Sequence, residues 1–224
     1  MNKYLFPVYA VILGIGIALL TKKQKSNGTK LLLSFSGAFL MALTLFDLLP
    51  EVYGHIEAKL AGLFIMLGIL LQIILELFSK GAEHGHVHMH DTDNKFPWLL
   101  FISLCIHSFL EGFPIHQHND MVYGVFVHKI PIATLITAFL INSGFSTFKI
   151  GAFLLVFATM TPLGTYVSNS TALSAETISL VNATVIGIFL HISTTILFES
   201  GEGHKFNLTK LVAICLGVLT AYFI

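Results

Sequence analysis

The chain has 224 residues, of which 55% are hydrophobic and only 11% are charged, and its formal net charge is zero. A soluble domain is typically about 25% charged, so this composition excludes a soluble globular protein and gives no sign of a nucleic-acid partner. Apolar runs near the ~20 residues that cross a bilayer recur along the whole sequence. We therefore expect one polytopic transmembrane domain over residues 1–224, embedded in a lipid bilayer.

Eight transmembrane helices are predicted, because the sequence lacks the alternation of a barrel and helices satisfy their own backbone groups in lipid. The first run has no small-residue cleavage site before Lys22, so we interpret it as a true span rather than a signal peptide. The predicted spans cover about residues 4–20, 31–49, 60–78, 96–113, 122–141, 150–167, 178–198 and 208–224.

The lysines predict the orientation of the chain. There is no Arg, and nine of the Lys lie at or beside odd-numbered connections, against Lys3 and Lys59 on the other side. Positive residues accumulate in cytoplasmic loops. We therefore expect a protein of the cell (inner) membrane with both termini outside the cytoplasm and a cytoplasmic loop at residues 79–95.

The second predicted span ends in a pair of carboxylates. Asp47 and Glu51 lie one helical turn apart and flank Pro50. With the predicted orientation they lie near the outer mouth, where they could gather cations at an entrance. An ordinary charged helix end explains them equally well.

The loop at residues 79–95 is rich in imidazole groups. Four His alternate with other residues, and two Asp follow. Such a tract binds borderline divalent metals weakly, although a polar linker without a metal role is the alternative. The four residues are His84, His86, His88 and His90.

The fourth predicted span carries His107 and Glu111, which lie one turn apart on the same helix face. Ionisable groups in lipid usually face a cavity, a partner or a metal. An imidazole with a carboxylate suits zinc, iron or manganese. The alternative is a hydrogen bond that only stabilises helix packing, and Ser108 beside them is either a weak ligand or a helix contact.

The fifth predicted span contains the sequence HKIP. Pro131 cannot donate a hydrogen bond to the carbonyl of Val127, which leaves a free carbonyl in the same turn as His128. Interrupted helices form ion sites in many transporters, but an ordinary proline kink is the simpler alternative. Lys129 either extends toward an interface or holds its ammonium group where a second cation could bind.

Two ionisable residues in other spans are expected to have structural roles. His191 in the seventh span is interpreted as a packed, hydrogen-bonded residue, and Glu76 in the third span as an interfacial carboxylate. A second hypothesis makes His191 a metal ligand. In it, three intramembrane His hold the zinc of a membrane hydrolase, with Glu111 as general base. The three would be His107, His128 and His191.

These motifs resemble the ZIP (Zrt/Irt-like) family of divalent metal transporters. DLLPE ends span 2 where the family often has HLLPE, TPLG occurs in span 6, and HSFLEG in span 4 is the most specific match. The resemblance implies an all-α fold of eight spans in a 3+2+3 arrangement with inverted repeats. It also implies a metal site at His107, Ser108, Glu111 and His128.

The chain departs from the family pattern after HKIP, where Ile132 and Ala133 replace residues that are usually ligands. A paired-metal site is therefore not expected, but two His and one Glu suffice for one ion. We expect transport of zinc, or of iron or manganese, with no resident cofactor and no enzymatic activity. A transport-inactive metal-binding relative is the alternative, and a homodimer is compatible with these features.

Overall fold

The computed structural model describes residues 3–21, 27–79, 96–116, 120–171, 173–199 and 208–224, and all regular structure in these ranges is helical. The all-α prediction is confirmed for this part of the chain. The helices are α1 (Phe6–Thr21), α2 (Asn27–Leu43), α3 (Leu49–His55), α4 (Ala58–Ser79), α5 (Trp98–Leu110), α6 (Met121–Asn142), α7 (Thr147–Ser170), α8 (Ala175–Glu199) and α9 (Leu208–Tyr222). Three short segments accompany them: η1 (Lys3–Leu5), η2 (Thr44–Leu48) and η4 (Pro114–His116).

In the described chain α2, η2 and α3 join into one continuous helix. The apolar helices therefore match the eight predicted spans one to one, in chain order. Five helices of the described chain are long and apolar enough to cross a membrane. The other three apolar helices, α1, α5 and α9, are shorter than 18 residues. The chain is thus an integral membrane protein with helices at all eight predicted places, five of them of full spanning length.

The joined helix α2–η2–α3 ends at His55, beyond the predicted end near residue 49. Its middle segment η2 is π-helical, and the Leu49 N–H donates to the Thr44 carbonyl five residues earlier. Pro50 follows directly, and it has no N–H to continue a regular ladder. The wider turn carries the helix through this proline, which the sequence pattern marked as a helix end.

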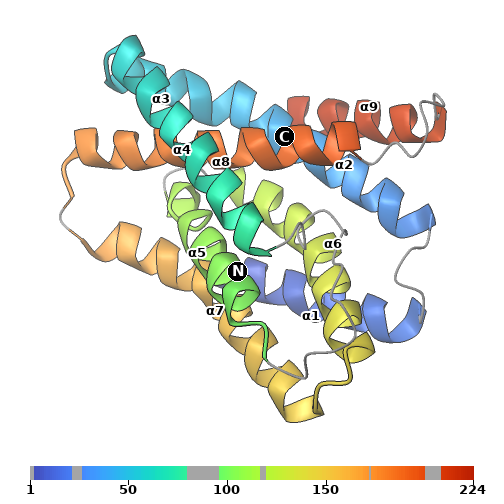
Figure 1. Cartoon of the computed structure of the whole chain (residues 1–224). Coiled ribbons are helices and arrows are strands. Elements are labelled where there is room, and N and C mark those ends of the chain that lie inside the picture. The colour runs from blue at the N-terminus through green and yellow to red at the C-terminus, as the bar shows by residue number, and fades with distance from the viewer. Residues whose placement is uncertain (1–2, 22–26, 80–95, 117–119, 172, 200–207) are drawn as a thin grey trace.

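The helices pack as two groups (Figure 1). In the first group, α1 packs along α6 and α5 packs along α7; these helices fill the lower part of the view. In the second group, α4 packs along α8 and α2 packs along α9, in the upper part. The groups meet where α2 contacts α6 and where α4 contacts α5. The fourth and fifth predicted spans therefore line the junction between the two groups.

Glycines allow the closest helix crossings. A Cβ on Gly68 of α4 would lie 2.0 Å from the Thr184 carbonyl oxygen of α8, and one on Gly164 of α7 would lie 1.9 Å from the Phe109 oxygen of α5. No side chain fits at such distances, so the backbones approach directly. Small residues serve the same purpose in other membrane helix pairs.

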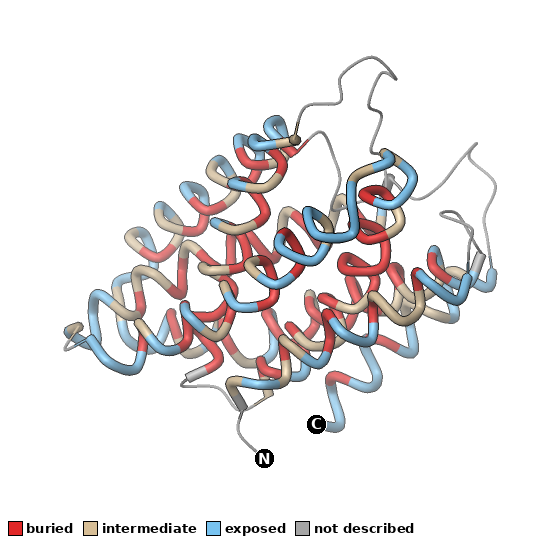
Figure 2. The backbone as a smooth tube through the Cα atoms, turned by 90° about the horizontal axis from the view of Figure 1, so that it is seen from below, coloured by how far each residue is buried: buried red, intermediate tan, exposed pale blue. Residues whose placement is uncertain are grey.

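Buried residues concentrate on α6, which is the most enclosed of the five full-length helices. Along the backbone as a whole, buried residues face the inside of the bundle and exposed residues face outward (Figure 2). The opposite case is α4, whose outer face exposes large apolar side chains such as Leu63, Leu70 and Leu77. A face of this kind suits contact with lipid. The centre of the described protein is therefore α6, and its buried polar residues lie far from solvent.

Candidate metal site

The last turn of α5 and the residue after it bring His107 and Glu111 together. The helix ends at Leu110 rather than near Phe113, because Gly112 and Pro114 follow. Glu111 still keeps helical backbone angles, and its N–H donates to the His107 carbonyl at 3.0 Å. The Nε2 atom of His107 lies 3.4 Å from Oε2 of Glu111. The predicted one-turn spacing is therefore present, at the end of the helix instead of inside it.

His128 on α6 lies across from this pair. The ring centroids of His107 and His128 are 6.4 Å apart and the ring planes are close to perpendicular, at 77°. All three residues are buried, each with at most 3% of its surface exposed. Among the described residues, no three His, Cys, Asp or Glu side chains are already arranged to hold a metal ion. The three predicted ligands are thus neighbours in a buried place without forming a finished coordination shell.

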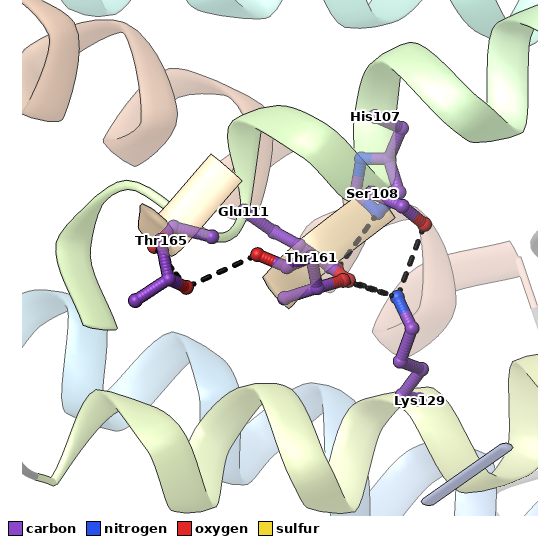
Figure 3. A network of polar contacts seen from close by, with 7 residues as sticks. His107, Ser108, Glu111, Lys129, Thr161 and Thr165 are labelled. Carbon is purple, nitrogen blue, oxygen red and sulfur yellow. Dashed lines mark hydrogen bonds and ion pairs between the residues drawn. The ribbon is translucent and has the colours of Figure 1, made fainter. Parts of the chain in front are cut away.

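Lys129 lies inside this cluster and does not extend toward an interface. Its ammonium group forms an ion pair with Oε1 of Glu111 and donates to the hydroxyls of Ser108 at 3.0 Å and Thr161 at 2.8 Å (Figure 3). It also lies 4.4 Å from the ring centroid of Phe157, a cation–π distance. The structure therefore favours the second of the two interpretations of Lys129, an ammonium group tethered beside the predicted ligands.

A row of hydroxyls on α7 faces the end of α5. The Thr161 hydroxyl donates to Oε1 of Glu111 at 2.6 Å, and the Thr165 hydroxyl donates to the Gly112 carbonyl at 2.8 Å (Figure 3). About one turn further along α7, the Ser168 hydroxyl donates at 3.2 Å to the carbonyl of the residue that follows Gly112. The sequence pattern did not predict this row. Its one signal was a set of small polar residues at helical spacing around TMTPLG.

The remaining predicted site residues lie elsewhere or outside the described residues. Asp47 and Glu51 are half-buried, on η2 and α3. The His191 imidazole lies 2.6 Å from the Glu76 carboxylate on α4, in line with its predicted structural role. The loop residues His84, His86, His88 and His90 lie outside the described residues.

Comparison with known proteins gives one positive result. The family model described as ZIP zinc transporter matches residues 83–224, which is more than half of the chain. The matched region contains α5 to α9 and hence every residue of the buried cluster. No curated protein matches the chain.

Proposed function

Since the chain belongs to the ZIP family of zinc transporters, we propose that it carries a divalent metal ion through the junction between its two helix groups. Members of this family are divalent metal transporters rather than enzymes. Zinc is the first choice of ion here, with iron and manganese next. The bound ion is cargo, and no resident cofactor takes part.

The observation that carries the proposal is the buried cluster of His107, Glu111 and His128, from the end of α5 and from α6, the next helix along the chain. Neutral imidazole and carboxylate are the donor set of zinc sites, with ligand distances of about 2.0–2.2 Å. Two imidazoles on one tetrahedral ion have centroids about 5 Å apart, whereas these are 6.4 Å apart. A small movement of α5 against α6 would complete the shell, as expected of a site that must also release its ion.

The cluster suits one ion rather than two. Lys129 already holds a positive charge against Glu111, and Ile132, one turn beyond His128, is a buried apolar residue without a donor atom. Ser108 accepts a hydrogen bond from Lys129, so in this state its hydroxyl supports the ammonium group. A second cation would be repelled at close range by the ammonium group of Lys129.

The proposed path crosses the membrane from the carboxylates at one mouth to the His-rich loop at the other. Ions would gather near Asp47 and Glu51, bind in the cluster, and leave toward the cytoplasmic loop at residues 79–95. The two helix groups would rock against each other to alternate access. In this scheme the chain forms one domain of eight spans in a 3+2+3 arrangement. It lies in the cell membrane with both termini outside the cytoplasm, and it is compatible with a homodimer.

Metal uptake tests the proposal. We expect His107→Ala or Glu111→Ala to abolish most zinc uptake, because each variant removes one of the proposed metal ligands. Thr137→Val serves as the matched control, since this buried hydroxyl on α6 has no hydrogen-bond partner among the described residues. Uptake is measured with radioactive zinc in cells at equal amounts of membrane protein. Unchanged uptake in both alanine variants would refute the assignment.

The same assay separates transport from zinc-dependent hydrolysis. A hydrolase built on three His needs His191, which here contacts Glu76 instead. We expect His191→Ala to retain zinc uptake. A metal-binding relative without transport activity would instead bind zinc in detergent and fail to move it in cells.

A further inference from the structure

The two oxygens of the Glu111 carboxylate have different neighbours. Oε1 receives the Thr161 hydroxyl at 2.6 Å and the ammonium group of Lys129. Oε2 lies on the side of His107, at 3.4 Å from the ring nitrogen. One oxygen is therefore engaged by α7 and α6, and the other is directed to the imidazole of α5.

The Thr161 hydroxyl is held in a single role. It has one proton, which it donates to Oε1, and its lone pairs accept from Lys129 at 2.8 Å. Its backbone is fixed as well: a Cβ on Gly112 would lie 2.3 Å from the Thr161 carbonyl oxygen, so α5 and α7 are in direct contact here. Thr161 is fully buried. The hydroxyl cannot turn away from Glu111 without giving up one of its bonds.

We propose that Thr161 is a positioning residue that, together with Lys129, reserves Oε1 of Glu111, so that a metal ion is taken by Oε2 alone beside His107. This inference rests on the proposed transport function and adds a source of metal selectivity. Zinc is satisfied by four ligands of mixed nitrogen and oxygen type. Metals that favour oxygen, such as manganese, gain more from a carboxylate that offers both oxygens. Reserving Oε1 therefore favours zinc.

The test compares three variants by the concentration dependence of zinc and manganese uptake. Thr161→Val removes the hydroxyl at nearly constant volume, Thr161→Ser keeps it, and Thr137→Val removes a buried hydroxyl elsewhere. We expect Thr161→Val to raise the zinc KM about tenfold, the size expected for a lost hydrogen bond to a charged group, with the maximal rate within about twofold. The manganese KM should rise less, so the preference for zinc falls.

The serine variant and the control should both stay within about twofold of the native chain for both metals. An unchanged zinc KM in Thr161→Val, an equal rise for both metals, or failure of the serine variant to restore the preference would each overturn the inference. If the valine variant does not accumulate in the membrane, Thr161→Ala gives the same readout without a branched side chain.

Failure of this inference is distinguishable from failure of the transport function. If Glu111→Ala keeps full zinc uptake, the transport site itself is wrong. If Glu111→Ala abolishes uptake while Thr161→Val behaves as the native chain, only the positioning role of Thr161 is rejected.

Discussion

Lys129 brings a full positive charge into the interior of the helix bundle, where its neighbours are Glu111, Ser108, Thr161 and the ring of Phe157. Removing two charges from water is costly, and a buried pair repays that cost only when both charges are well coordinated. Here hydroxyls complete the shell around both. The pair is therefore stable as a unit and unstable when one member is removed.

Lys129→Met tests this dependence. Without metal, we expect the variant to lose about 3–5 kcal/mol of stability, because the Glu111 carboxylate is left buried without its cation. Added zinc should restore more stability to the variant than to the native chain, since a divalent ion can replace the ammonium charge. Thermal unfolding in detergent, with chelator and with zinc, measures both effects. Glu111→Gln added to Lys129→Met should recover part of the loss; if Lys129→Met alone is as stable as the native chain, the pair is unimportant.

At this scale the sequence predicted the ionisable residues but not their partners. His107 and Glu111 could be paired from their spacing, because a helix fixes residues four apart. The direction of Lys129 depends on Thr161 and Phe157, which lie on another helix far along the chain. Sequence spacing contains no information on such a contact, so both interpretations of Lys129 remained open until the structure was known.

Among the elements, the crossing of α5 and α7 sets the geometry of the cluster. Gly112 and Gly164 let the two backbones touch, and the Thr161 and Thr165 hydroxyls then reach Glu111 and the turn after it. A wider crossing would separate Thr161 from the carboxylate. The Thr161 hydroxyl therefore reaches Glu111 because Gly112 and Gly164 have no side chains to hold the two helices apart.

Gly164→Ala tests the crossing. The new Cβ would lie 1.9 Å from the Phe109 carbonyl oxygen, so α7 must move away. We expect a loss of about 1–3 kcal/mol in stability and a rise in the zinc KM. The matched control is Gly151→Ala on the same helix, where a Cβ meets nothing within 4 Å, so its stability should stay the same or rise. Equal unfolding temperatures for the two variants would contradict the role of Gly164.

Hydropathy was sufficient to predict where helices lie but not how they end. A described helix lies at each of the eight predicted spans, because apolar runs of this length have few alternatives in lipid. The extension of α3 to His55 was missed because a π-helical turn carries the chain through Pro50. The early end of α5 was missed because the predicted span ran through Gly112 and ended only before Pro114.

At the scale of the whole molecule, the connections between helices can be used to test the predicted orientation in the membrane. Ser146 lies between α6 and α7, and Ser174 lies between α7 and α8; both are exposed. In the predicted orientation, with both termini outside, the first connection would be cytoplasmic and the second would be external. The lysine bias behind this orientation is a statistical rule of insertion and leaves no trace in helix packing.

Cysteine labelling checks the orientation. In a background with Cys105 and Cys215 replaced by Ala, we expect Ser174→Cys to react with an impermeant maleimide on intact cells. Ser146→Cys should react only after the cells are permeabilised. The reverse pattern would place the termini in the cytoplasm and would invert the proposed path from entrance to loop.

The internal ion pair also has an electrical consequence. Under the proposed function, a site that holds one ammonium and one carboxylate is neutral when empty, so the membrane voltage would not act on its return movement. Loaded with a divalent ion, the same site would carry two extra charges, each worth about 2.3 kcal/mol per 100 mV. Under the proposed function, an interior-negative membrane would therefore pull the loaded form inward and leave the empty form free to come back.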